Sequence, residues 1–133
     1  MISVILSTHN DEKTVSDAIS SILNQSHIDF ELIIINDCST DKTKEVIKSF
    51  DDKRIVYLEN KKNIGRSRSR NKGIKISKGD FIAIMDGDDI SVPNRLDVQI
   101  NYLKKNLNID LVASNVIYFY EKKVLGASSL KQH

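Results

Sequence analysis

One segment of the chain carries most of the information about its architecture: Phe81-Ile82-Ala83-Ile84-Met85-Asp86-Gly87-Asp88-Asp89. Its first five residues are apolar, which favours a strand buried on both faces, because a strand with one solvent-exposed face would alternate polar and apolar residues. Three carboxylates then follow at the C-terminal tip of this strand. In open α/β sheets, ligands bind beyond that edge. We therefore expect a binding site where this strand ends.

The acids at this tip allow two interpretations. Asp86 and Asp88 are separated only by Gly87, so a turn could aim both carboxylates at one hard divalent cation, Mg or Mn, that also carries phosphate oxygens. Clusters of acids and glycine after strands are also common as solvated turns. The three residues alone do not separate a metal site from a turn, so the rest of the chain has to decide.

Length and composition exclude several classes of protein. The chain has 133 residues, is 40% hydrophobic and 29% charged, and has a formal net charge of +2, which is ordinary for one globular domain. A single cysteine, Cys38, excludes an internal disulfide framework, and no Cys/His spacing typical of zinc is present. There is no apolar run of about 20 residues and no leader pattern, so we expect a cytoplasmic protein.

Apolar periodicity predicts strands that alternate with helices. We expect strands at residues 2–6, 30–35, 54–58, 81–85 and 110–114, and a hairpin made of 116–120 and 122–125 with Glu121 in its turn. We expect helices at residues 14–24, around 46–50, at 66–77 and at 94–106. The third strand is the most polar and should lie near an edge, and Ile74 and Ile76 should face inward. This order predicts an α/β fold: a mostly parallel sheet with right-handed crossovers and helices on both faces.

Polar residues follow three of these strands: Ser7-Thr8-His9-Asn10, Asn36-Asp37 and Asp86-Gly87-Asp88-Asp89. Parallel strands bring all three groups to one rim of the sheet. There an aromatic ring can stack on a base, Asp37 can accept hydrogen bonds from base or ribose, and a cation can bridge a diphosphate. The rim therefore suits a nucleotide.

Four ordered motifs between Ile2 and about Ser114 resemble the nucleotide-binding half of a family 2 glycosyltransferase of the GT-A (Rossmann-like) fold. The matching residues are Val4-Ile5-Leu6-Ser7-Thr8-His9-Asn10, Ile34-Ile35-Asn36-Asp37-Cys38-Ser39-Thr40-Asp41, Asn63-Ile64-Gly65 with Arg70-Asn71-Lys72-Gly73, and Asp86-Gly87-Asp88-Asp89 with Pro93 and Arg95. The chain departs from the family at Asn36, where a second aspartate is frequent, and at Cys38, where glycine is frequent.

The resemblance implies roles for these positions. Ser7 and His9 match residues that contact the base, Asp37 one that binds the base, Asp86 one near the ribose, and Asp88 the metal ligand on the donor diphosphate. We therefore expect a nucleotide site made of Ser7, Thr8, His9, Asn10, Asp37, Arg70, Asp86 and Gly87, and a Mg or Mn site made of Asp88 and Asp86. Within the basic run from Arg66 to Lys72, Arg70 is the best candidate for a phosphate contact.

The activity that the resemblance implies is metal-assisted transfer of a sugar, with inversion, from a nucleotide-sugar to a hydroxyl of a carbohydrate or lipid-linked acceptor, as in surface polysaccharide synthesis. The family takes its general base from an acid well beyond the metal motif, and no such later acid pair is present. We therefore expect residues 1–133 to be one nucleotide-sugar-binding domain that stops before the acceptor-binding part and lacks the base. Any membrane attachment would come from that missing region.

Other functions remain to be weighed. A haloacid dehalogenase-type phosphotransferase would use Asp86 as nucleophile and Asp88 as acid, but that family places its motif on the first strand. A dinucleotide oxidoreductase lacks its glycine fingerprint here. A nucleotide-sugar binding module without turnover stays open. The basic run has no interleaved aromatic residues, which favours a solvated face over nucleic-acid binding.

Overall fold

The computed structural model describes residues 1–120 and 123–128, so the turn expected at Glu121 and the tail after Ser128 lie outside the described residues. The chain divides into two compact units, Met1–Asp97 and Val98–His133. None of the described helices is both long enough and apolar enough to cross a membrane.

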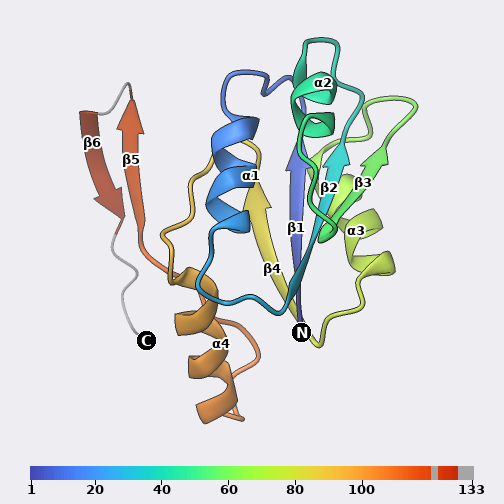
Figure 1. Ribbon diagram of the computed structural model, residues 1–133. Helices are drawn as coiled ribbons and strands as arrows, with labels where there is room; N and C mark the ends of the chain where they lie inside the picture. Colours follow the sequence, from blue (N-terminus) through green and yellow to red (C-terminus); the bar gives the residue numbers. More distant parts are fainter. Residues whose placement is uncertain (121–122, 129–133) are drawn as a thin grey trace. The chain divides into compact units, whose positions relative to one another are not determined.

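The first unit contains a four-stranded parallel sheet with the order β3-β2-β1-β4 (Figure 1). Its strands are β1 (Ile2–Thr8), β2 (Phe30–Asn36), β3 (Ile55–Glu59) and β4 (Phe81–Asp86), and its helices are α1 (Val15–Leu23), α2 (Thr43–Lys48) and α3 (Arg66–Ile76). A further helix, α4 (Arg95–Lys105), begins in this unit and continues into the second. The predicted alternation of strands and helices is confirmed.

The strand order determines where the helices lie. The chain moves outward from β1 through β2 to β3, and then returns past β1 to place β4 on its other side. Because parallel crossovers are right-handed, this reversal puts α1 and α2 on one face of the sheet and α3 on the opposite face (Figure 1). The prediction of helices on both faces is confirmed, and the C-terminal ends of β1, β2 and β4 meet at one rim.

The core lies on both sides of β1 and β2, whose residues are buried throughout. On one face α1 contributes its apolar stripe, Val15, Ala18, Ile19 and Ile22. On the other face Ile5, Ile33 and Ile35 form a buried cluster against which Val56 and Leu58 of β3 pack. These apolar runs made the first two strands predictable.

Helix α3 contacts the sheet through small residues. Ser69 and Gly73 are its buried positions. A Cβ on Gly73 would lie 2.8 Å from both Ile35 Cδ1 and Ile5 Cγ2, so the helix backbone rests directly on the cluster. The prediction that Ile74 and Ile76 face inward is wrong: they are 44% and 41% exposed, and the buried positions of the helix are the small residues Ser69 and Gly73.

The prediction that β4 is buried on both faces is also wrong. β4 is an edge of the four-stranded sheet, as is β3, for which an edge position was expected. Ile82 and Ile84 are 41% and 37% exposed. Ile84 pairs with Ile5 and so points to the α3 face, but α3 packs mainly on β1 and β2 and leaves Ile82 and Ile84 exposed.

The second unit contains an antiparallel hairpin of β5 (Val116–Tyr120) and β6 (Lys123–Ser128). The predicted hairpin is confirmed. The strand predicted at 110–114 is wrong, since these residues have no regular structure and Leu111 is 79% exposed. A strand needs a neighbour for its backbone hydrogen bonds, and no described strand pairs with this segment.

The close contact of α3 makes a stability prediction. Gly73→Leu should lower the free energy of unfolding by about 2 kcal/mol, because the new side chain must displace Ile5, Ile35 or the helix itself. Urea unfolding measures the change. The matched control is Ser67→Leu on the exposed side of α3, which should change stability by less than about 0.5 kcal/mol. Equal effects of the two substitutions would contradict this packing.

Candidate functional site

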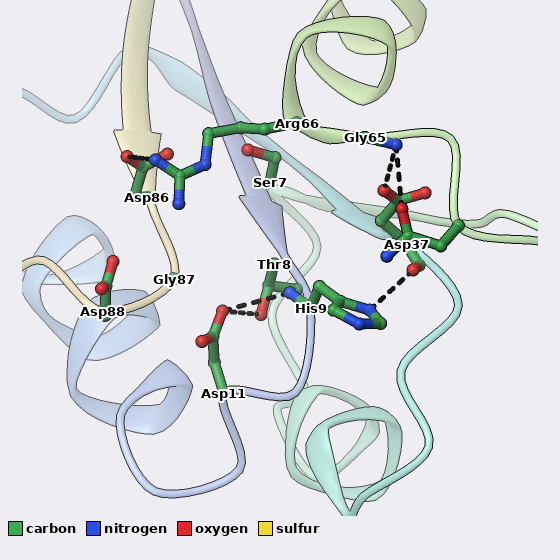
Figure 2. Close-up of a pocket in the computed structure, with 11 residues that line it drawn as sticks. Ser7, Thr8, His9, Asp11, Asp37, Gly65, Arg66, Asp86, Gly87 and Asp88 are labelled. Carbon is green, nitrogen blue, oxygen red and sulfur yellow. Dashed lines mark hydrogen bonds and ion pairs between the residues drawn. The ribbon is translucent and has the colours of Figure 1, made fainter.

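An open cavity of about 250 Å³ lies in the first unit, at the C-terminal ends of β1, β2 and β4 (Figure 2). It is lined by Ser7, Thr8, His9, Asp11, Asp37, Asn63, Gly65, Arg66, Asp86, Gly87 and Asp88. The three polar strand ends singled out in the sequence therefore meet, as parallel strands require. Every one of these residues is polar, charged or glycine, so the cavity suits a polar ligand.

The turn after β1 is held by one carboxylate. Asp11 Oδ2 accepts hydrogen bonds from Thr8 Oγ1, at 2.7 Å, and from the His9 backbone N–H, at 3.1 Å. Gly87 lies against this pair, since a Cβ at Gly87 would lie 2.6 Å from Asp11 Oδ2 and 2.7 Å from Thr8 Oγ1. The close approach of the two turns therefore requires glycine at this position.

The His9 ring is oriented by the neighbouring strand end. Its Nδ1 lies 2.9 Å from the backbone oxygen of Asp37, which can only accept, so Nδ1 carries a proton. Asn10 Nδ2 donates to His9 Nε2 at 3.3 Å. Two contacts thus fix an aromatic ring at the wall of the cavity (Figure 2), where a planar ligand can stack on it.

Asp37 joins β2 to the loop that precedes α3. It is 3% exposed, and its Oδ1 accepts from Asn60 Nδ2 at 2.8 Å and from the Ile64 N–H at 3.0 Å. Its Oδ2 accepts from the Gly65 N–H at 2.8 Å. Burial alone would raise the pKa of Asp37, but these hydrogen bonds outweigh it and hold the pKa below its usual value. The group is therefore a carboxylate near neutral pH and can accept one more donor through Oδ2.

Asp86 is neutralised by α3. Arg66 Nη1 lies 3.2 Å from Asp86 Oδ2, and Arg70 Nη2 binds Asp86 Oδ1. Asp88 lies on the other side of Gly87, apart from Asp86 (Figure 2). The next residue, Asp89, has a raised pKa because neighbouring protein atoms partly shield it from water and because the carboxylates of Asp88 and Asp86 lie nearby. The sequence spacing thus does not bring Asp86 and Asp88 together in this structure.

A divalent cation fits this site only together with a ligand. No group of three or more His, Cys, Asp or Glu side chains among the described residues could hold a metal ion. Asp88 offers one carboxylate to the cavity. Mg²⁺ is commonly held in this way, by one or two carboxylates, water and the phosphate oxygens of a substrate. The donor set therefore fits a cation that arrives with a phosphate-bearing ligand.

One buried hydroxyl in the cavity lacks a partner. Ser7 is 6% exposed, and its Oγ makes no hydrogen bond with any described group. Buried polar groups are nearly always hydrogen-bonded, so this hydroxyl is available to a further partner. Since Ser7 lines the cavity, a ligand donor or acceptor would complete this group.

The predicted site residues are distributed as follows. Ser7, Thr8, His9, Asp37, Asp86, Gly87 and Asp88 line the cavity as expected. Asn10 and Arg70 do not line it: Asn10 Oδ1 accepts from the Thr40 N–H at 2.8 Å, and Arg70 binds Asp86. Their predicted nucleotide contacts remain predictions.

Sequence reasoning missed four lining residues: Asp11, Asn63, Gly65 and Arg66. Asn63 and Gly65 belonged to a recognised motif, but nothing in the sequence showed that β2 and this loop share the Asp37 carboxylate. Arg66 was assigned to a solvated face. Its position at the first turn of a helix that packs on β1, the neighbour of β4, could have identified it once the strand order was known.

The fold and the cavity define a doubly wound α/β domain with a polar ligand site at the C-terminal edge of its sheet. The model of the family Glycosyl transferase family 2 matches residues 3–130. The chain therefore belongs to this family of glycosyltransferases.

Named relatives agree with this assignment. The chain is 36% identical, over 126 residues, to the Escherichia coli UDP-Glc:alpha-D-GlcNAc-diphosphoundecaprenol beta-1,3-glucosyltransferase WfgD, covering 95% of this chain and 49% of the relative. It superposes on Staphylococcus aureus TarS 1-349, solved with UDP-GlcNAc, with a TM-score of 0.75 and 26% identity, covering 80% of this chain and 32% of the other. The chain spans about half the length of the curated relatives it matches.

A more distant structure supports the fold alone. The mannosyltransferase PcManGT from Pyrobaculum calidifontis, solved with GDP-Man and Mn2+, superposes with a TM-score of 0.71 at 19% identity, over 77% of this chain and 32% of the other. The α/β fold with a four-stranded parallel sheet is thus the GT-A fold that the sequence predicted.

The loop after β2 contains a strained residue. Cys38 has φ of 60°, a conformation that costs a residue with a side chain about 1–2 kcal/mol. Cys38→Gly should remove this strain, whereas Cys38→Val should increase it, because a β-branched side chain tolerates positive φ poorly. We expect the glycine variant to be the more stable of the two by at least about 1 kcal/mol in urea unfolding. Equal stability would contradict the assigned backbone conformation.

Asp37 should make stability depend on pH. Its pKa is lower in the folded chain than the ordinary 3.8, so its ionised form stabilises the fold above about pH 4 and this contribution is lost as the pH falls through the folded pKa. Asp37→Asn should therefore show a smaller loss of stability on acidification than the wild type. Asp17→Asn, which removes an exposed carboxylate of α1, is the control and should follow the wild type. Identical acid sensitivity of all three proteins would refute a special role for Asp37.

Proposed function

We propose that this chain is the donor-binding part of an inverting glycosyltransferase, which moves a sugar from a nucleotide-sugar to an acceptor hydroxyl. The observation that carries the proposal is the convergence of an oriented His9 ring, the Asp37 carboxylate, the unpartnered Ser7 hydroxyl and Asp88 in one cavity. Membership of Glycosyl transferase family 2 supports it.

The nucleoside would bind at the end formed by β1 and β2. The His9 ring gives a stacking surface, and Asp37 Oδ2 retains a lone pair for an N–H of the base or a hydroxyl of the ribose. Ser7 Oγ lies on the same wall of the cavity and gains a hydrogen-bond partner when a ligand enters. The UDP-GlcNAc complex of a structure with the same fold supports a nucleotide-sugar as the ligand.

The diphosphate would bind toward β4. Four aspartates and one arginine line the cavity, so a bare diphosphate would meet a surplus of negative charge. We propose that Asp88 holds a Mg or Mn ion that carries the phosphate oxygens, with Asp86 as a second ligand only if its arginines release it. A bound cation supplies stabilisation of the negative charge that develops on the departing nucleoside diphosphate. Arg66, which reaches the cavity from α3, would offer a further positive charge to the phosphates.

The acceptor side of the reaction is proposed from the relatives. The printed name of the Escherichia coli relative specifies a sugar on diphosphoundecaprenol as its acceptor. We propose a carbohydrate or lipid-linked acceptor of this kind for the whole protein, in the synthesis of a surface polysaccharide. An attacking hydroxyl needs a general base within hydrogen-bond reach, and we place that base outside residues 1–133.

Calorimetric titration tests the donor site. With Mn²⁺ present, one nucleoside diphosphate of a panel (UDP, GDP, ADP, CDP) should bind, and a chelator should weaken it. Asp88→Asn should weaken binding about tenfold or more, because the cation loses its protein ligand and the phosphates lose the cation. Asp17→Asn, the same chemical change outside the cavity, should bind as the wild type does.

Two results would contradict the proposal. One is a folded protein that binds no nucleoside diphosphate in the presence of Mn²⁺. The other is binding that Asp88→Asn and the chelator leave unchanged, which would remove the cation from the site. Binding with the expected dependence, but with no hydrolysis or transfer of the sugar, is the result expected of a donor-binding part that lacks the general base.

A further inference from the structure

The segment from Asn60 to Gly79 concentrates the positive charge of the chain. It contains eight of the 20 Lys and Arg residues and no Asp or Glu: Lys61, Lys62, Arg66, Arg68, Arg70, Lys72, Lys75 and Lys78. The remainder of the chain has 12 basic and 18 acidic residues. The small net charge of +2 therefore conceals a strongly basic region around α3 in a chain that is otherwise acidic.

Most of these charges are not neutralised. Arg66 and Arg70 pair with Asp86, and Lys72 Nζ donates to the neutral amide oxygen of Asn60 at 2.6 Å. No carboxylate among the described residues forms an ion pair with the other five side chains. We call the six cations without an acidic partner the basic face: Lys61, Lys62, Arg68, Lys72, Lys75 and Lys78.

Helix geometry turns two of these cations, Arg68 and Lys75, away from the sheet. Ser69 and Gly73 form the inward side of α3, so Arg68 and Lys75, two turns apart on one line, lie on the side opposite the sheet. Ile74 and Ile76, the apolar residues near the end of the helix, are also exposed. Figure 1 shows α3 on the face of the sheet opposite α1 and α2, with no other element of the first unit covering it.

We propose that the basic face of α3 docks on an anionic phospholipid surface. Lysine and arginine close to such a surface are attracted to its lipid head groups, and each raises binding about fivefold. Exposed isoleucines beside the cations can enter the boundary between head groups and acyl chains, as on interfacial helices. Segment 60–79 has no aromatic residue for stacking on bases, which favours lipid over single-stranded nucleic acid.

Docking through α3 would link the lipid surface to the cavity. Gly65 and Arg66, where the helix begins, line the cavity, and the first outward cation of the helix, Arg68, follows two residues later. A nucleotide bound at the rim would therefore lie next to the lipid surface. The lipid contact itself does not depend on the proposed transferase function, because it can be measured without nucleotide.

Vesicle sedimentation with the whole chain tests the proposal. The protein should sediment with vesicles of phosphatidylglycerol and phosphatidylcholine in equal parts, but not with pure phosphatidylcholine, and about 0.5 M sodium chloride should release it. Arg68→Glu with Lys75→Glu should weaken binding at least about twentyfold. The control, Lys104→Glu with Lys105→Glu, makes the same change of net charge on exposed residues of α4 and should bind as the wild type does.

Three results would overturn the proposal. The first is no binding to the anionic vesicles, with the protein shown to be folded by circular dichroism. The second is an equal loss in both double variants, which would make net charge rather than the basic face responsible. The third is that Ile74→Ser with Ile76→Ser leaves vesicle binding unchanged while the wild type binds poly(U) more tightly than lipid, which would assign the face to nucleic acid.

Discussion

The buried carboxylate of Asp37 is the contact on which the geometry of the site depends. It accepts backbone N–H groups from Ile64 and Gly65 and the amide of Asn60, and so fixes the loop that leads into α3. Gly65 adopts φ of 86° there, a conformation suited to glycine. One carboxylate at the end of β2 thus determines where α3 begins and what its first turn faces.

The position of α3 then determines the electrostatics on both sides of the helix. With Gly73 against Ile5 and Ile35, the start of the helix directs Arg66 and Arg70 to Asp86 at the end of β4. Arg68 and Lys75, on the side of the helix away from Ser69 and Gly73, lie outward. The same packing contact therefore separates the charge used inside the cavity from the charge available to a partner.

Much of the fold could be predicted from the sequence, because apolar runs mark strands and parallel strands bring their C-terminal ends to one rim. This argument placed Ser7, His9 and Asp37 together. The order of the strands in the sheet and the rotation of each helix about its axis were harder to predict from the sequence. The exposure of Ile84 follows from the edge position of β4, and that of Ile74 from Gly73 facing the sheet, and neither fact is encoded in local periodicity. Arg66 was missed for the same reason, since its partner lies across a crossover.

The spacing of Asp86 and Asp88 in the sequence does not by itself determine whether their side chains lie together. Two residues with one between them share a face only while the chain remains extended. Here β4 ends at Asp86, and the Asp89 N–H donates to the Asp86 carbonyl at 3.3 Å, so the chain turns between the two acids. Asp86 keeps the strand's orientation toward α3, whereas Asp88 lies on the side of the β1 turn near Asp11. The two carboxylates are therefore available for different tasks, one for the arginines of α3 and one for a cation brought by the ligand.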